Sequence, residues 1–406
     1  MKDSIVIGGG LAGLIAANIA ARAGLSVTVV EKSKSLGGRA RSAVRDQFIF
    51  NQGPHALYIR GNLARTLSDL GIKVTGKKGA PRGTYISRES EFASMPTNVL
   101  GLLTHPWFSR KGRVDMIRFY GRAIMGRMNG SALAFELDQI KDAKAKGFAS
   151  SLVRLSTYNA EPERIVAHAA ADQLKLATGG VLYLDGGWQT IVDGLEKSAR
   201  ARGVEFLTGQ KVEQIESSRD EVRVHTTERI IESRTAILAT DPESENAWLG
   251  TKIGSGKKLR AACLDVALDR LPEPDHIFAQ DIAEPLYLSV HSASANLGPG
   301  QVIHVARYLK EGEEAGEGTK KQLRDFLARF QPGSEDRIVQ ERFLPDMIVA
   351  HDFQDTTEQP GVEIDSAKPL FRAGDWVRGS GMLSDRSAFT AVAAAEKAMA
   401  RIRAKS

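Results

Sequence analysis

Residues 5–14 read IVIGGGLAGL and join a hydrophobic strand to a glycine-rich turn and the start of an apolar helix. Gly8 permits the tight turn, and Gly10 lets the backbone approach a pyrophosphate without a side chain in the way. Gly13 lets the helix pack closely on the strand, so that the amide groups at its N-terminus face the phosphates. We expect this helix to continue over residues 15–23. The stretch therefore predicts a Rossmann-like α/β domain that binds an adenine dinucleotide.

A second predicted strand, residues 26–30, ends in Glu31. This carboxylate stands about twenty residues past the turn, which is the spacing at which an acid binds the ribose hydroxyls of a dinucleotide. A glycine cluster alone is weak support, because glycine-rich loops are common, but strand, turn, helix, strand and acid together are specific. The residues expected to contact this end of the cofactor are Gly8, Gly10, Leu11, Ala12, Gly13, Glu31 and Lys32.

Residues 32–42 read KSKSLGGRARS, which puts two glycines and an arginine just beyond the ribose-binding acid. A nicotinamide enzyme has no need of this feature. The segment resembles the GG-doublet flavoproteins, the class that contains monoamine oxidases, protoporphyrinogen oxidases and carotenoid (phytoene) desaturases. In that family it folds back over FAD with the arginine near the phosphates and the ribityl chain, which implies contacts from Gly38 and Arg39. For these residues alone, a Gly-Gly turn with solvated arginines is the alternative.

Residues 371–376, FRAGDW, resemble the family's C-terminal FAD motif, in which a strand ends in Gly-Asp and the acid hydrogen-bonds the ribityl hydroxyls. A glycine loop over residues 379–383 follows, and then a predicted helix over residues 384–402. The positive end of this helix would lie at the pyrimidine edge of the isoalloxazine, where reduced flavin carries negative charge. At this end of the chain the resemblance implies FAD contacts from Gly374, Asp375, Met382 and Leu383.

Two internal segments complete the expected FAD site. In the relatives, a segment like Gly53-Pro54-His55 lies beside the flavin. His55 is therefore the candidate for a catalytic proton-transfer group, and a histidine placed by a proline turn equally suits a structural role. Residues 210–215 resemble the segment whose valine contacts adenine through its backbone, which here is Val212. We assign no other catalytic residue.

The chain of 406 residues is long enough for two domains. The resemblance implies a glutathione-reductase-like FAD-binding domain and a discontinuous α+β substrate or cap domain. Residues 74–179 have a mainly helical pattern, and residues 302–306 are an example of the strands expected in the second part of the cap. The FAD-binding domain is predicted over residues 1–75, 180–245 and 344–406, and the cap over residues 76–179 and 246–343.

A single cysteine, Cys263, excludes an internal disulfide and any CxxC motif for zinc or redox chemistry. It lies in residues 262–268, which alternate like a half-buried strand, so we expect a packed thiol. Monoamine oxidases bind FAD through a cysteine near their C-terminal motif, but no cysteine lies near Asp375. We therefore expect FAD to be bound non-covalently, and we expect no metal site.

The net charge of +6 raises the question of an acidic partner. Most basic residues are dispersed and no nucleic-acid motif is present, so we expect no nucleic-acid partner. Residues 106–128 mix arginines and lysines with large apolar side chains, which would suit a helix at a membrane surface; a cap helix whose arginines face water is the alternative. No apolar stretch approaches the roughly 18 residues of a membrane span. We expect a cytoplasmic protein whose contact with the inner face of a membrane, if any, is peripheral.

These features predict an FAD-dependent oxidoreductase that acts on a mainly apolar small molecule by hydride transfer from a C–H bond to flavin N5. Residues 380–383, SGML, carry Met382 where monoamine oxidases place an aromatic residue, which weakens an amine-oxidase interpretation. Residues 384–386, SDR, are closer to desaturases and porphyrinogen oxidases. Amine oxidation, a non-redox isomerase and a flavin-free binding module remain alternatives, and the intact motifs argue against the last.

Overall fold

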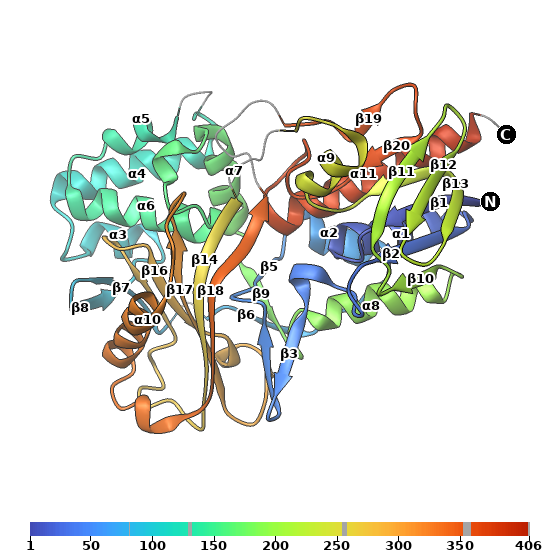
Figure 1. Cartoon of the computed structure of the whole chain (residues 1–406). Helices are drawn as coiled ribbons and strands as arrows, with labels where there is room; N and C mark the ends of the chain where they lie inside the picture. The colour runs from blue at the N-terminus through green and yellow to red at the C-terminus, as the bar shows by residue number, and fades with distance from the viewer. Residues whose placement is uncertain (81, 129–131, 254–257, 352–358, 405–406) are drawn as a thin grey trace.

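The computed structural model describes residues 1–80, 82–128, 132–253, 258–351 and 359–404. Two large β-sheets lie on opposite sides of the molecule, and helices pack against both of them (Figure 1). The two chain termini lie together on the side of the first sheet, shown at the right of Figure 1.

The first sheet has a parallel centre. In spatial order its strands are β10 (Glu205–Thr208), β2 (Val27–Glu31), β1 (Lys2–Ile7), β13 (Ile230–Leu238), β12 (Val222–Thr226) and β11 (Val212–Ser217), with β20 (Leu370–Arg372) beside β13 and β19 (Glu363–Asp365) beside β20. β1 pairs in parallel with β2 and β13, and the end of β13 pairs in parallel with β20. Ile5 and Val6 point to opposite faces and both are fully buried. A strand buried on both faces explains the unbroken apolar run at residues 5–7.

Helices cover one face of this sheet, and α9 packs with the β11–β12 hairpin on the other. The helices on this side of the molecule are α1 (Leu11–Arg22), α2 (Asn62–Asp69), α8 (Gln189–Arg200), α9 (Pro242–Leu249) and α11 (Leu383–Arg403). α1 packs on α11 through alanines on both helices, including Ala16, Ala20 and Ala391, which are fully buried. Small side chains allow the two helix axes to approach closely. The helices predicted over residues 15–23 and 384–402 are therefore present.

The second sheet is mainly antiparallel. In spatial order its strands are β18 (Ile338–His351), β14 (Lys258–Leu268), β17 (Gln301–Leu309), β16 (Leu286–Val290), β15 (Phe278–Asp281), β7 (Thr84–Arg88) and β8 (Glu91–Ser94). β14 lies between β17 and β18, and α10 (Glu317–Phe330) packs on the sheet through residues such as Phe326. The expectation that residues 262–268 are half-buried is wrong, because both faces of β14 are covered. Residue 344, the predicted domain boundary, lies within the continuous strand β18.

A layer of helices stands beside the second sheet, at the upper left of Figure 1. They are α3 (Val99–Thr104), α4 (Arg110–Ile124), α5 (Leu133–Asp138), α6 (Ala143–Thr157) and α7 (Ala167–Ala177). The mainly helical pattern predicted for residues 74–179 is present, but this stretch also contributes β7 and β8 to the edge of the second sheet. Within the described part of the chain, no helix is both long and apolar enough to cross a membrane.

Two small sheets lie between the large ones. β3 (Ser42–Arg45) pairs with β4 (Phe48–Asn51), and β9 (Val181–Leu184) pairs with both β5 (Leu57–Tyr58) and β6 (Gly76–Lys78). The chain crosses between the two halves at these strands, so residues from both large sheets meet here. This region contains the cavity described below.

Candidate cofactor and substrate cavity

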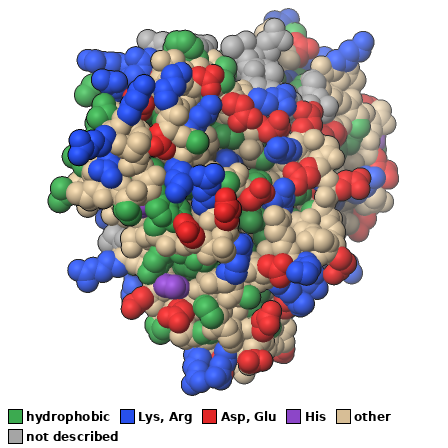
Figure 2. Space-filling view, turned by 90° about the vertical axis from the view of Figure 1, so that its left-hand side faces the viewer, with side chains coloured by type: hydrophobic (Ala, Val, Ile, Leu, Met, Phe, Trp, Pro, Cys, Tyr) green, Lys and Arg blue, Asp and Glu red, His purple; other side chains and the backbone are tan. Residues whose placement is uncertain are grey.

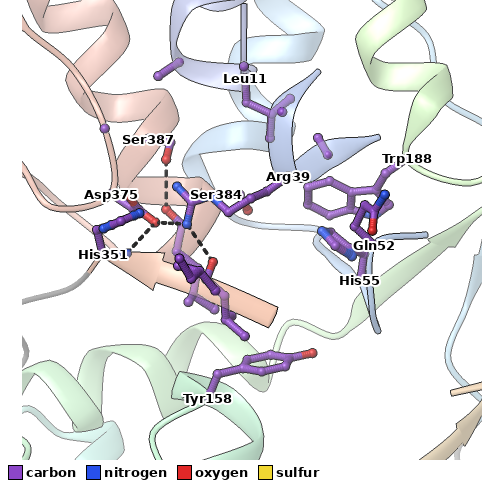
Figure 3. A pocket seen from close by; sticks show the side chains of 18 of the residues that line it. Leu11, Arg39, Gln52, His55, Tyr158, Trp188, His351, Asp375, Ser384 and Ser387 are labelled. Carbon is purple, nitrogen blue, oxygen red and sulfur yellow. Dashed lines mark hydrogen bonds and ion pairs between the residues drawn. The ribbon is translucent and has the colours of Figure 1, made fainter. Parts of the chain in front are cut away.

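A cavity of about 1470 Å³ runs from the glycine-rich turn of the first sheet to the helices and strands around the second sheet. Side chains from segments that are far apart in sequence meet in it, as Figure 3 shows for Leu11, Arg39, His55, Tyr158 and Asp375. One end is lined by backbone and charged groups, and the other end by aromatic and aliphatic side chains.

The turn after β1 depends on three glycines for different reasons. Gly8 has a φ of +107°, and a Cβ on it would lie 2.4 Å from the carbonyl oxygen of Ala239. A Cβ on Gly13 would lie 1.9 Å from the carbonyl oxygen of Gly8, so the helix could not pack against the turn. A Cβ on Gly10 would meet nothing within 4 Å and would point into open space. Gly10 therefore leaves room for a ligand, whereas the other two glycines are required by the protein's own packing.

Glu31 ends β2 beside this turn. Its Oε2 accepts a hydrogen bond from the amide of Gly9 at 2.7 Å, and its Oε1 accepts one from the amide of Ser33 at 2.8 Å. The two backbone amides orient the carboxylate at the rim of the cavity, and each oxygen keeps a lone pair for a ligand hydroxyl.

Asp375 lies just past β20 and is only 2% exposed. Its Oδ2 accepts hydrogen bonds from Arg39 at 2.6 Å and from the amide of His351 at 3.2 Å, and Arg39 also donates to the carbonyl of Val349 (Figure 3). Among the described residues, Oδ1 has no hydrogen-bond partner. Burial opposes ionisation of this carboxyl, but Arg39 and the His351 amide outweigh that effect and hold its pKa below the usual range. Asp375 is therefore a buried carboxylate with one oxygen available.

His55 lies across the cavity, with its ring centroid 4.8 Å from that of Trp188. Its Nδ1 is 2.9 Å from the carbonyl oxygen of Gly53, which can only accept, so Nδ1 carries the proton and Nε2 is an acceptor. Burial lowers the pKa of His55 to about 4, so the ring is neutral near pH 7.

The sequence profile of a family described as flavin containing amine oxidoreductase matches residues 11–246, more than half of the chain. The chain belongs to this family. Membership implies a flavin cofactor. The cavity described above is lined by residues from both ends of the chain, as the sequence predicted.

Two curated proteins match parts of this chain. The phytoene desaturase of Cercospora nicotianae is 43% identical over 71 residues, which is 18% of this chain and 11% of the relative. The 4,4'-diaponeurosporene oxygenase of Staphylococcus aureus (strain MRSA252) is 26% identical over 259 residues, or 53% of this chain and 50% of the relative. The chain thus spans half or less of the length of these relatives.

Among solved structures, an oxidoreductase from Methanosarcina mazei superposes with a TM-score of 0.79 and 19% identity, covering 97% of this chain and 100% of that one. At this identity the likeness shows the fold alone. It confirms the predicted α/β architecture, a Rossmann-like cofactor domain with a cap.

Most of the residues that the sequence predicted to contact the cofactor line the cavity. They are Gly8, Gly10, Leu11, Ala12, Glu31, Lys32, Gly38, Arg39, Pro54, His55, Val212, Gly374, Asp375 and Leu383. Gly13, Gly53 and Met382 lie behind its wall. A Cβ on Gly53 would meet the sulfur of Met347 at 2.3 Å, and Met382 is buried as the N-cap of α11. These three support the wall of the site without facing it.

Several residues that line the cavity were not predicted from the sequence. Thr240 and Asp241 follow β13, whose end lies beside β1 at the carboxyl edge of the parallel strands. The rule that ligands bind at this edge would have found them. Trp188 is the N-cap residue of α8, and its buried Nε1 has no partner among the described residues. His351 reaches the site through the long strand β18, for which no sequence signal exists.

A buried polar cluster lies in the second sheet, behind the cavity. Asp265 accepts a hydrogen bond from the Cys263 thiol at 3.0 Å, lies 2.5 Å from Nδ1 of His304, and accepts one from Nε of Arg342 at 2.9 Å. Cys263, Asp265 and His304 are residue types that bind metals, and their ligand atoms lie within 4.8 Å of one another. Because the guanidinium of Arg342 already neutralises the carboxylate, we interpret the cluster as a buried ion-pair network.

The inner end of the cavity is aromatic and aliphatic. Its lining includes Tyr58, Tyr120, Leu152, Leu155, Tyr158, Leu174, Tyr183, Phe278 and Tyr287. Among the described residues of β6 and the second sheet, Lys78 on β6 and Asp346 on β18 are the charged ones that line the cavity, and Asp346 is paired with Arg260 at 2.7 Å. This end can bury an apolar molecule, and it offers no unpaired carboxylate to a cation.

Proposed function

We propose that this protein is an FAD-dependent oxidoreductase that dehydrogenates a mainly apolar small molecule by hydride transfer to flavin N5. The observation that carries the proposal is the continuity of one cavity, in which a dinucleotide cradle opens into an aromatic and aliphatic chamber. FAD supplies a two-electron acceptor when it is bound, and the protein supplies orientation and exclusion of water.

The residues of the cradle fit FAD. The open space at Gly10 and the amides at the start of α1 suit the diphosphate, and Glu31 suits the adenosine ribose. Asp375 Oδ1 and Trp188 Nε1 are buried polar atoms without partners among the described residues, one an acceptor and the other a donor. A polyol chain such as ribityl can satisfy both. In this proposal residues 1–75, 180–245 and 344–406 bind FAD, and the cap, residues 76–179 and 246–343, binds the substrate.

Non-covalent binding is part of the proposal. Cys263 lies on β14 within a fully buried cluster that includes Tyr287 and Tyr308, and it is not among the residues that line the cavity. Burial raises the pKa of its thiol well above the usual value, so a nucleophilic thiolate is disfavoured.

A dehydrogenated C–H/C–H pair suits this chamber better than an amine. A cationic amine would need a carboxylate partner, and Asp346 is already paired with Arg260. The names of the two curated relatives point to the same class of substrate. His55 Nε2 is placed to accept a proton from the substrate after it binds, which is the role we propose for this residue.

The first experiment is an absorption spectrum of the purified protein, followed by acid precipitation and identification of the released flavin. We expect a yellow protein that releases all of its FAD into the supernatant. Asp375→Ala should lower FAD occupancy, and Asp269→Ala, an exposed change beyond the cavity, should not. Anaerobic mixing with polyenes should then bleach the flavin and mixing with amines should not. A colourless protein that cannot be reconstituted would refute the proposal.

A second proposal concerns the surface around residues 106–128. α4 buries Met116 and Phe119 but leaves Val114, Ile124 and Met125 exposed among arginines, and Leu100 of α3 is 71% exposed nearby in sequence. Figure 2, which views this side of the molecule, shows basic and hydrophobic side chains interspersed. We propose that this surface contacts an anionic membrane.

Co-sedimentation with vesicles tests this contact. Binding to phosphatidylglycerol vesicles should exceed binding to phosphatidylcholine vesicles, and it should weaken in Leu100→Ser. The exposed Ile230 lies on the first sheet, so Ile230→Ser is the matched control and should bind like the wild type. Equal binding to both vesicle types would contradict the proposal.

A further inference from the structure

The innermost part of the cavity holds two tyrosine hydroxyls, those of Tyr158 and Tyr287, that the proposed hydride transfer does not use, and His55, the proposed proton acceptor, lies next to the same turn. We propose that Tyr158, Tyr287 and His55 together recognise a hydroxyl group on the otherwise apolar substrate. This inference rests on the proposed function, because it names the polar group that the same cavity selects.

Tyr158 occupies an unusual backbone position. It is the C-cap of α6 and has a φ of 58° and a ψ of 17°, the left-handed region that glycine and asparagine ordinarily fill at helix ends. A bulky residue there is an outlier whose strain must be offset by what the side chain does. Figure 3 shows its ring extending from the helix end into the cavity below Arg39 and His55.

The hydroxyl proton of Tyr158 is used in a hydrogen bond within the protein. Its hydroxyl lies 2.7 Å from the carbonyl oxygen of Pro54, which can only accept, so Tyr158 donates there. The hydroxyls of Tyr158 and Tyr287 lie 3.1 Å apart. Because the Tyr158 proton is already used, Tyr287 donates to Tyr158. One lone pair on Tyr158 and two on Tyr287 are then left without a donor among the described residues.

His55 adds a third acceptor next to the same turn. Its Nδ1 donates to the carbonyl of Gly53 at 2.9 Å, which leaves the lone pair of Nε2 available. Burial raises the pKa values of Tyr158 and Tyr287 and lowers that of His55, so all three groups stay neutral near pH 7. The hydrogen-bonding pattern is therefore constant across the physiological pH range.

The neighbouring hydroxyls of Tyr58 and Ser156 do not supply the missing donor, and the buried hydroxyl of Tyr308 makes no hydrogen bond to a described residue. Tyr58 donates to the carbonyl of Ser156 at 3.2 Å, and the Ser156 hydroxyl donates to the carbonyl of Val153 at 3.1 Å. The cluster thus presents acceptors and has its own protons turned toward the protein. A ligand satisfies it by bringing an O–H group, whereas an ether or a hydrocarbon leaves buried acceptors unpaired.

A matched pair of ligands tests whether the hydroxyl proton of the ligand contributes to binding. Geranylgeraniol and geranylgeranyl methyl ether have the same apolar chain, and only the alcohol can donate. Equilibrium dialysis against the protein as purified should show that the alcohol binds about tenfold more tightly, the effect of one satisfied hydrogen bond. Geranylgeranylamine is the third probe and should bind more weakly than the alcohol.

Three variants assign the preference to residues. Tyr287→Phe should reduce the alcohol-to-ether ratio of affinities to within about threefold. Tyr158→Phe should act in the same direction. Tyr183→Phe is the matched control, because Tyr183 also lines the cavity but its hydroxyl lies 3.4 Å from Ser289 Oγ, and it should keep the wild-type ratio. The thermal midpoint and FAD content of each variant verify that it is folded.

The inference is overturned if the wild type binds alcohol and ether equally, binds neither, or binds the amine most tightly. It is also overturned if Tyr287→Phe keeps the wild-type ratio. The dialysis readout does not depend on flavin reduction. A colourless protein with a clear alcohol preference would therefore refute the proposed function and leave the recognition site intact, and a yellow protein without the preference would do the reverse.

Discussion

Two buried aspartates, Asp375 in one half of the molecule and Asp265 in the other, differ in how their carboxylate oxygens are used. Asp375, beside the first sheet, is 2% exposed, and Asp265, in the second sheet, is fully buried. Both have pKa values held below the usual range by cationic neighbours that outweigh burial. Asp375 leaves Oδ1 without a partner among the described residues, whereas both oxygens of Asp265 are bonded.

The surroundings explain the difference. The side chain of Arg342 is only 6% exposed and joins Asp265 to the backbone of Asn51, so this network is closed on the protein. The side chain of Arg39, the partner of Asp375, is 43% exposed and lies along the cavity. A closed network holds strands together, and an open one is available to a ligand. We therefore expect Asp265 to determine stability and Asp375 to determine cofactor binding.

The largest effect should come from Asp265→Asn. Removing this charge leaves the guanidinium of Arg342 buried without a counter-ion, which costs about 3–5 kcal/mol. Thermal denaturation should show a greatly lowered midpoint, and the exposed change Asp269→Asn should shift the midpoint little. A midpoint for Asp265→Asn close to the wild type would show that the network is not structural.

The glycines of the turn provide the same contrast between packing and binding. Gly13→Ala forces a Cβ against the carbonyl of Gly8 and should destabilise the protein by about 1–3 kcal/mol. Gly10→Ala meets no protein atom within 4 Å, so its thermal midpoint without cofactor should match the wild type while FAD affinity falls. Equal loss of stability in both variants would remove the distinction.

The pH dependence should reveal His55 on the cofactor side. Its pKa is about 4 in the folded protein and about 6.5 in an unfolded chain, so the unfolded chain binds more protons between these values and stability rises with pH across that window. Lowering the pH from 7 to 5 should cost the wild type about 2 kcal/mol more than His55→Gln. Thermal midpoints of both proteins at the two pH values check this, and parallel shifts would place the titration elsewhere.

Asp375→Asn should have a much smaller effect on stability than Asp265→Asn, about 1 kcal/mol, because Arg39 can turn toward solvent when its partner is neutral. The FAD occupancy of Asp375→Asn, measured by absorbance after gel filtration, should nevertheless be lower than that of the folded fraction of Asp265→Asn. A higher FAD occupancy in Asp375→Asn than in Asp265→Asn would contradict the assignment of cofactor binding to Asp375.

Much of the cofactor end could be predicted because its signals are local. A glycine that must avoid a neighbouring carbonyl, such as Gly8, is visible in a motif of a few residues, and so is the acid that ends β2, Glu31. Strand continuity was less visible. Residues 230–238, for example, form one strand that pairs with β12 along its first half and with β1 along its second half, and this change of partner depends on the tertiary structure.

The sequence by itself determined the glycine-rich turn and the buried position of Cys263. It also determined that Gly374 and Asp375, from the other end of the chain, lie in the same cavity as that turn. The tertiary structure decided which groups meet across the cavity. The His351 amide reaches Asp375 because the register of β18 on β14 places it there, and Tyr158 reaches Pro54 because α6 ends opposite that turn. Contacts of this kind depend on how distant elements dock, and no local pattern of residues encodes that geometry. The residues that line the cofactor end are therefore signalled by local sequence, and the selectivity that we propose for the inner end depends on the packed fold.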